Sequence, residues 1–382
     1  MKKTLVALAA ATAMCGASAA SLTLYGIVDT GFAYNSINWD EYQGLAGKGG
    51  DSFGMMSGQS SGSRFGFKGE EELGNGLTVG FVLENGFNSD TGSLGDSAGR
   101  LFNRESSLYI EGGFGKFGMG RLSTLANDAG TTGIGGYFSS FGTGQGDVGC
   151  QTYMQAYRPS RMDNLVYYKT PNFAGAEVWL LYGMGDNGSE NESTSDRYYA
   201  AAVTYNNGGL SLYGAVDVLN KKTWNGETNA AVPGHGKDQV TVTVAANYDC
   251  GFAKSYLGVH WFDNAGSVGG SDKEWGRLNG LVDGYRYGDA TGWSVMAGVD
   301  VPVGGGKIKT SIGYLDASSD AYSPALGKEV DKDFSRFMAA AGYEYYLSKR
   351  TTVYAGAGYI QDAVANTDPR WLQVNAGLKH KF

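Results

Sequence analysis

The side chains of this chain that could act on a solute are charged rather than catalytic. Arg64, Arg104 and Arg161 stand at the borders of segments in which apolar and polar residues alternate. Asp128 and Asp147 fall in a long glycine-rich stretch between them. If the fold sets these arginines opposite these aspartates across a narrow gap, the charges would order water and sort solutes by size and dipole. The alternative for the same residues is an ion-paired support that holds the stretch in place.

Histidine chemistry has little support in the sequence. His235, His260 and His380 are not spaced as metal ligands and form no cluster with cysteine, so no metal is expected. A Ser-His-acid hydrolase would need a nucleophile beside His260, and none is identified. We therefore interpret His260 as a solvated lining residue and expect no catalytic residue and no cofactor.

Nucleotides and nucleic acids are not expected as partners. Two Gly-x-Gly-x-x-Gly patterns, at 113–118 and 144–149, fit the dinucleotide fingerprint, but neither opens a helix after a buried strand. The formal net charge of −8 also leaves no basic surplus for phosphate groups.

Alternation with a period of two residues runs through most of the chain. Val240, Val242 and Val244, for example, alternate with Thr241 and Thr243. This period predicts strands, because a helix would need a period near 3.6. Sixteen strands are predicted, at 21–33, 61–72, 76–88, 102–112, 115–121, 161–170, 174–184, 196–205, 209–218, 238–248, 252–262, 290–302, 306–316, 333–346, 350–361 and 371–382.

The spacers between these strands alternate between short turns and long segments. Leu73–Asn75 and Asp249–Gly251 are short, whereas 122–160 and 263–289 are long. An even number of strands with short turns at one end and long loops at the other is the layout of outer-membrane β-barrels. The last strand alternates up to a terminal aromatic residue, Phe382, as the closing strand of such a barrel does.

The N-terminus predicts export from the cytoplasm. Residues 1–19 have the positive start, the short apolar run and the small-x-small end of a secretory signal peptide. Cleavage is expected after Ala19, with Ala20 or Ser21 as alternatives, which leaves a barrel domain at 20–382. Loss of Lys2 and Lys3 changes the formal charge from −8 to −10.

The strand period also predicts which arginines face the interior. Arg64 and Phe65 lie on opposite faces, so Arg64 faces inward if the phenylalanine faces lipid. An arginine facing lipid at mid-depth would cost about 2–4 kcal/mol. Arg161 is assigned to the interior in the same way. Arg104 has the parity of the apolar Leu108, so an inward position requires a bulge or a place outside the hydrocarbon.

Seven motifs occur in order along the chain. They are Ser21–Gly26, Ser63–Gly76, Phe102–Arg104, Gly118–Arg121, Arg161–Asn164, Leu347–Thr351 and Gly377–Phe382. Together they resemble the general diffusion porins of Gram-negative bacteria, particularly the β-proteobacterial branch. The resemblance implies a 16-stranded antiparallel transmembrane β-barrel that forms a homotrimer, with the third external loop (122–160) folded into the lumen. The interior of that loop matches no pattern of the family.

The expected function is a passive diffusion channel for small hydrophilic solutes and ions across the outer membrane, in contact with lipid and lipopolysaccharide. If Arg64, Arg104 and Arg161 line the constriction opposite only Asp128 and Asp147, the pore should favour anions weakly.

The main alternative is a substrate-specific channel for a sugar or an organic acid. Such channels present a path of aromatic side chains, which Tyr137, Phe138 and Phe141 could begin. The sequence shows no continuation of that path.

Overall fold

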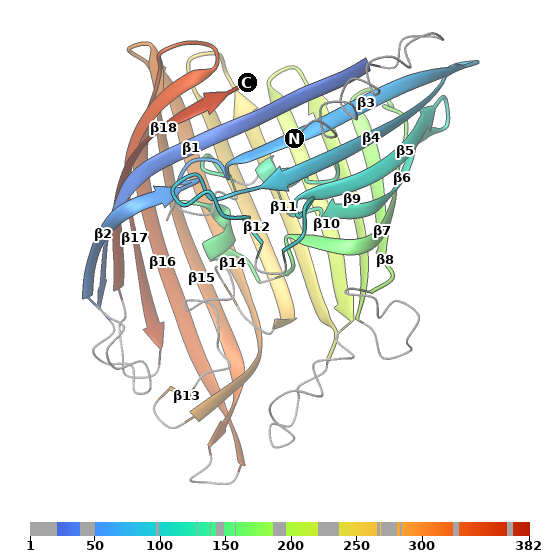
Figure 1. The fold of residues 1–382 in the computed structure, drawn as a ribbon. Coiled ribbons are helices and arrows are strands. Elements are labelled where there is room, and N and C mark those ends of the chain that lie inside the picture. The colour runs from blue at the N-terminus through green and yellow to red at the C-terminus, as the bar shows by residue number, and fades with distance from the viewer. Residues whose placement is uncertain are drawn as a thin grey trace.

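The structure, a computed structural model, describes most of the predicted barrel domain. The described residues are 21–38, 50–96, 99–127, 129–137, 139–142, 149–156, 158–185, 196–220, 237–265, 268, 281–282, 285–323, 328–364 and 370–382. They form one closed antiparallel sheet (Figure 1). β1 (Ser21–Asn38) closes it by pairing with β18 (Arg370–Lys381).

The remaining strands follow one another around the cylinder in chain order. They are β2 (Gly50–Ser57), β3 (Arg64–Gly74), β4 (Leu77–Gly86), β5 (Glu105–Gly112), β6 (Gly115–Ser123), β7 (Arg161–Lys169), β8 (Ala176–Gly183), β9 (Arg197–Asn207), β10 (Leu210–Asn220), β11 (Gln239–Asp249), β12 (Lys254–Ala265), β13 (Leu281–Val282), β14 (Tyr285–Val303), β15 (Gly306–Ser323), β16 (Lys328–Tyr346) and β17 (Thr351–Val364).

These eighteen segments make sixteen barrel strands. β2 and β3 lie one after the other along the same edge of β1, so together they count as one barrel strand. The two residues of β13 pair only with the start of β14, and β12 continues directly to β14 in the barrel. The predicted 16-stranded antiparallel barrel is therefore confirmed.

Side chains are distributed in the reverse of a soluble sheet. On β11, Val244 is 60% exposed, whereas Thr241 and Thr243 are 0% and 2% exposed on the other face. The apolar residues point outward and the polar ones inward, as the two-residue period predicts. A band of exposed apolar residues in water would be unfavourable, but it suits a hydrocarbon surrounding.

The C-terminus lies beside β1 at the short-turn end of the barrel (Figure 1). Phe382 and Gly26 exchange two backbone hydrogen bonds, each 3.1 Å from nitrogen to oxygen. A Cβ on Gly26 would lie 2.7 Å from the Arg64 carbonyl oxygen, which cannot move without disturbing the ladder, so this position needs glycine.

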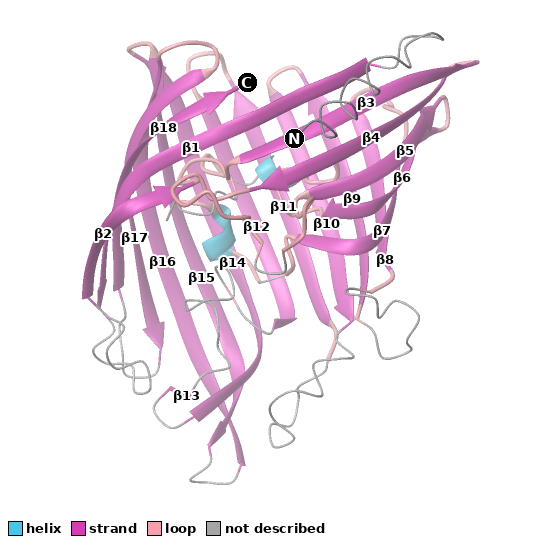
Figure 2. Ribbon diagram, in the orientation of Figure 1, coloured by secondary structure: helices cyan, strands magenta, loops and turns pink. Residues whose placement is uncertain are grey.

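Several strands are longer than predicted. β1 and β2 fill part of the spacer 34–60, and β15 and β16 extend into 317–332, with Asp320 opposite Asp331. There the backbone ladder continues past the predicted strand ends, because backbone hydrogen bonds do not require an apolar period. The described helical segments are the 3-10 turns η1 (Gly135–Tyr137) and η2 (Gln151–Met154), drawn in cyan in Figure 2. None of the helices described is long and apolar enough to cross a membrane.

Candidate functional site

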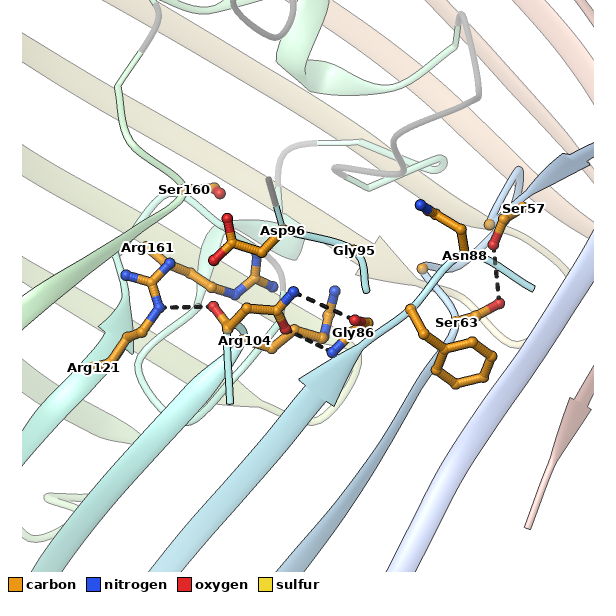
Figure 3. Close-up of a pocket in the computed structure, with 14 residues that line it drawn as sticks. Ser57, Ser63, Gly86, Asn88, Gly95, Asp96, Arg104, Arg121, Ser160 and Arg161 are labelled. Atoms are coloured by element: carbon orange, nitrogen blue, oxygen red, sulfur yellow. Dashed lines mark hydrogen bonds between the residues drawn. The ribbon is translucent and has the colours of Figure 1, made fainter. Parts of the chain in front are cut away.

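A polar cavity lies against the inner face of the barrel, where β3 to β7 reach its long-loop end. About 200 Å³ of it is open to water. Arg104, Arg121 and Arg161 line it together with Asp96, and their side chains gather on one side of the cavity in Figure 3. Ser57 lies on the opposite side in the same view. The cavity therefore brings together cationic groups from separate segments of the chain.

Glu84 joins two of the predicted arginines. Its Oε1 lies 2.6 Å from Nε of Arg104, and its Oε2 lies 3.6 Å from Nε of Arg64. The Tyr25 hydroxyl donates to the same Oε2 at 3.1 Å. One carboxylate thus holds two guanidinium groups close to each other in spite of their mutual repulsion.

A second set of ion pairs lies beside the first. Asp163 accepts from Arg121 through Oδ1 and from Arg100 through Oδ2, the latter at 3.2 Å. Arg100 also lies 3.1 Å from Asp96 in the preceding loop. The hydrogen bond to Asp96 raises the pKa of Arg100 above its ordinary value, so this group stays charged.

Arg161 stands among these arginines. Its Nε is buried and has no hydrogen-bond partner within the described residues. We call the five arginines and their three carboxylates the arginine cluster: Arg64, Arg100, Arg104, Arg121, Arg161, Glu84, Asp96 and Asp163. These eight side chains carry five positive and three negative formal charges.

Backbone irregularities aim these side chains at the cavity. The β6–β7 ladder is interrupted between Gly120 and Leu122, where Gly120 has φ of 136° and Asn164 has φ of 54°. A Cβ on Gly120 would lie 2.0 Å from the Ser106 carbonyl oxygen, which explains the glycine. Such bulges redirect side chains near functional sites. Arg104 needs no bulge, because β5 begins one residue later at Glu105.

The segment between β6 and β7 is held by side chains from the opposite part of the barrel. His260 of β12 accepts from the Ala156 N–H through Nε2 at 3.2 Å. The Ser294 hydroxyl of β14 donates to the Met154 carbonyl, and Ser311 of β15 donates to Gly149 at 3.1 Å. These are inner-face side chains that bind loop backbone groups.

Arg336 of β16 makes the strongest of these attachments. Its Nε and Nη2 donate to the two oxygens of Asp362 at 2.6 and 2.7 Å, and its Nη1 donates to the Tyr153 carbonyl at 2.9 Å. Arg336 is only 2% exposed. A bidentate pair fixes the guanidinium plane, so the third donor is presented to the loop in one orientation.

The predicted site residues have different outcomes. Arg64, Arg104 and Arg161 lie together, whereas Asp128 and Asp147 lie outside the described residues. Sequence reasoning missed Glu84 and Arg121 as site residues. Both are charged residues in strands with alternating polarity, and that signal could have identified them.

The interpretation of His260 as a solvated lining residue is wrong. Its ring is fully buried, with Nδ1 2.8 Å from the Thr243 hydroxyl and Nε2 bound to the loop. Phe141 is also buried, with Lys309 Nζ 4.8 Å from its ring centre, so it does not begin an exposed aromatic path. Phe138, the side chain of Tyr137, and His235 lie outside the described residues. Within the described residues, no three His, Cys, Asp or Glu side chains group as metal ligands.

Comparisons with known proteins agree with this architecture. A family model described as Gram-negative porin matches residues 6–363. An outer membrane porin protein of Bordetella pertussis is 31% identical over 418 aligned residues, which cover all of both chains. Outer membrane porin protein 32 of Delftia acidovorans is 31% identical and covers 96% of this chain and 92% of its own.

Solved structures show the same fold. An anion-selective porin from Comamonas acidovorans superposes with a TM-score of 0.64 at 25% identity, covering 95% of this chain and 100% of that one. A trimer form of the outer membrane protein OmpT of Vibrio cholerae gives a TM-score of 0.60 at 15% identity, covering 96% and 100% of the two chains.

Proposed function

The chain belongs to the Gram-negative porin family, and from this we propose that it is an outer-membrane pore whose narrowest part favours anions. Membership of the family makes it a diffusion channel of the outer membrane and not an enzyme. Barrels of sixteen strands are wide enough to leave an aqueous path, which smaller barrels fill with side chains. The proposal concerns what narrows that path and which ions it selects.

The third loop, 122–160, forms one side of the constriction in this proposal. Support comes from the hydrogen bonds that join Tyr153, Met154 and Ala156 to inner-face side chains of β12, β14 and β16. Backbone groups bound by inward-pointing side chains support a path of this loop inside the cylinder. Buried polar groups need such partners, because an unsatisfied one would cost about 1–3 kcal/mol.

The arginine cluster forms the other side. The observation that carries the ion preference is the convergence of five arginines on β3 to β7 and the neighbouring loop, where three carboxylates pair with four of them. Charges at a constriction act over a distance shorter than the Debye length of about 8 Å, so salt screens them less than the charges of the outer loops. The porin from Comamonas acidovorans that shares the fold is described as anion-selective, which agrees with this preference.

The proposal also covers the trimeric assembly and the signal peptide. A protein of the same fold is described in a trimer form, and the outward faces of β1 and β18 are apolar at Leu22, Leu24 and Leu378. These faces suit contact with lipid or with a second barrel. Residues 1–19 are proposed as the signal peptide removed on export, with 20–382 as the mature pore.

The proposal is tested in planar bilayers with purified trimer. Wild type should give ohmic conductance steps, and a salt gradient should give a reversal potential on the anion side. Arg64→Glu should move that potential toward cations. Lys68→Glu is the matched control, because Lys68 lies four residues along the same face of β3, about 13 Å away. A strongly cation-selective wild type, or equal shifts in the two variants, would refute a selective role for the cluster.

A further inference from the structure

The second barrel strand is interrupted at the level of the arginine cluster. β1 pairs with β2 up to Thr30 opposite Ser57, and with β3 from Ile27 opposite Arg64. Six residues, 58–63, therefore lie opposite only two residues of β1. The four extra residues cannot join the ladder and must leave the wall. We call residues 58–63 the inward bend.

The bend lies on the inner side of the wall. Gln59 and Ser63 are 1% and 2% exposed. Ser60 accepts a hydrogen bond at 2.8 Å from Nζ of Lys379, an inner-face residue of β18 whose neighbour Leu378 is exposed on the outside. The extra residues thus occupy lumen space instead of bulging into lipid.

Asp29 holds the middle of the bend through its carboxylate. Oδ2 accepts from the backbone N–H groups of Ser60 and Ser61 at 3.1 and 2.7 Å. Oδ1 accepts from the Tyr354 hydroxyl of β17 at 2.6 Å. Asp29 is fully buried, and all three contacts donate to it, which is the pattern expected for an ionised carboxylate.

The backbone of Asp29 holds the two ends of the bend. Its carbonyl accepts from the Gly58 N–H at 2.9 Å, the Ser63 hydroxyl at 3.0 Å and the Ser89 hydroxyl at 2.7 Å. Its N–H lies 3.0 Å from the Ser63 hydroxyl oxygen. One residue of β1 therefore contacts the bend at both ends and in the middle.

The bend in turn contacts the arginine cluster. The Gly62 carbonyl accepts from Arg64 Nη1 at 2.9 Å. A Cβ on Gly62 would lie 3.1 Å from Nη1 of Arg104, so the bend also packs closely against the second guanidinium. The bend thus contacts both of the guanidinium groups that Glu84 pairs with.

We propose that Asp29 is a positioning residue of the pore, which presents Arg64 and Arg104 to passing ions by holding the inward bend in place. This inference rests on the proposed selective role of the arginine cluster. In this proposal the negatively charged Asp29 increases the preference of the pore for anions. A negative group beside the lumen should favour cations, whereas a group that presents two arginines should favour anions.

The sign of the effect provides the test. Asp29→Asn keeps the size of the side chain, but its amide NH2 cannot accept a hydrogen bond, so one set of contacts is lost. Withdrawal of a guanidinium from about 5 to 8 Å from the ion path should lower the chloride-to-potassium permeability ratio about twofold, by Coulomb's law with screening. A ratio that rises or stays constant in Asp29→Asn would overturn the inference.

Two further variants separate positioning from other effects. Tyr354→Phe removes one partner of Asp29 without changing any charge, and should lower the ratio in the same direction. If Asp29→Asn does not fold into heat-modifiable barrels, Tyr354→Phe replaces it as the test of positioning. In an Arg64→Gln, Arg104→Gln background, Asp29→Asn should no longer lower the ratio. An equal fall in that background would show that Asp29 acts elsewhere and would refute its positioning role.

The same series distinguishes this inference from the proposed function. If the double arginine variant leaves the permeability ratio unchanged, the cluster does not set selectivity and both statements fail. If the double arginine variant lowers the ratio but Asp29→Asn and Tyr354→Phe do not, only the role of Asp29 fails.

Discussion

Removal of the Glu84 charge should strengthen the anion preference of the pore. Glu84 lies between Arg64 and Arg104 and neutralises part of their charge. In Glu84→Gln the amide oxygen can still accept from Nε of Arg104, so the geometry is largely retained. The arginine cluster then has five positive and two negative formal charges, an excess of three instead of two.

The size of the effect follows from Coulomb's law. A unit charge about 5 Å from the ion path contributes about 0.8 kcal/mol in water, and about 0.4 kcal/mol after screening over a Debye length near 8 Å. The charge acts with opposite sign on chloride and potassium, so the two contributions add. The chloride-to-potassium permeability ratio should therefore rise about fourfold.

The assay is the reversal potential of single trimers in a potassium chloride gradient. Glu177→Gln is the matched control, because Glu177 pairs with Lys169 at 3.2 Å near the opposite end of the barrel, and it should leave the ratio nearly unchanged. A Glu84→Gln pore with an unchanged or lowered ratio, and with normal trimer mobility, would refute the assignment of the constriction to this cluster.

Three other predictions follow from the same contacts. Arg161→Gln removes one cation of the cluster and should lower the chloride-to-potassium ratio about fourfold, measured in the same gradient; no change would exclude Arg161 from the ion path. Arg336→Met leaves Asp362 buried without its partner and should destabilise the barrel by about 3–5 kcal/mol, seen as a lower unfolding temperature in detergent. Lys169→Met, at a partly exposed ion pair, should cost less than about 1 kcal/mol. Equal losses would refute the anchoring role of Arg336. The purified protein should run as a trimer in detergent electrophoresis and as a monomer after boiling, and a monomer in mild detergent before heating would contradict the proposed assembly.

The barrel could be predicted from the sequence because its main determinant is local. Alternating residues such as Val242 and Thr243 report directly which face meets hydrocarbon and which meets water, without knowledge of any distant contact. The strand ends beyond the apolar band could not be predicted. There the ladder is held by backbone hydrogen bonds, to which every residue type except proline contributes in the same way.

The arginines could be predicted to share a region, but their partners could not. Arg64 and Glu84 are neighbours only because β3 pairs with β4 in one register, and the sequence does not state that register. His260 shows the limit more plainly. Its inward parity is correct, yet whether an inward histidine meets water or a loop backbone depends on the path of residues 149–156, which no periodic pattern encodes.

The inward bend could not be predicted from the sequence either. The run Ser60–Ser63 is polar and glycine-bearing, which is equally typical of an ordinary turn before a strand. What distinguishes it is the pairing of β1 with two strands in succession and the burial of Asp29 between them. Both are properties of the closed barrel and not of any segment.

The central claim is that the arginine cluster sets the ion preference of an outer-membrane diffusion pore. It is tested most directly by the reversal potential of the triple variant Arg64→Gln, Arg104→Gln, Arg161→Gln beside wild type in the same salt gradient. Wild type should lie on the anion side and the triple variant on the cation side, since the carboxylates of the cluster would then outnumber its arginines. A triple variant that keeps the wild-type potential would contradict the claim.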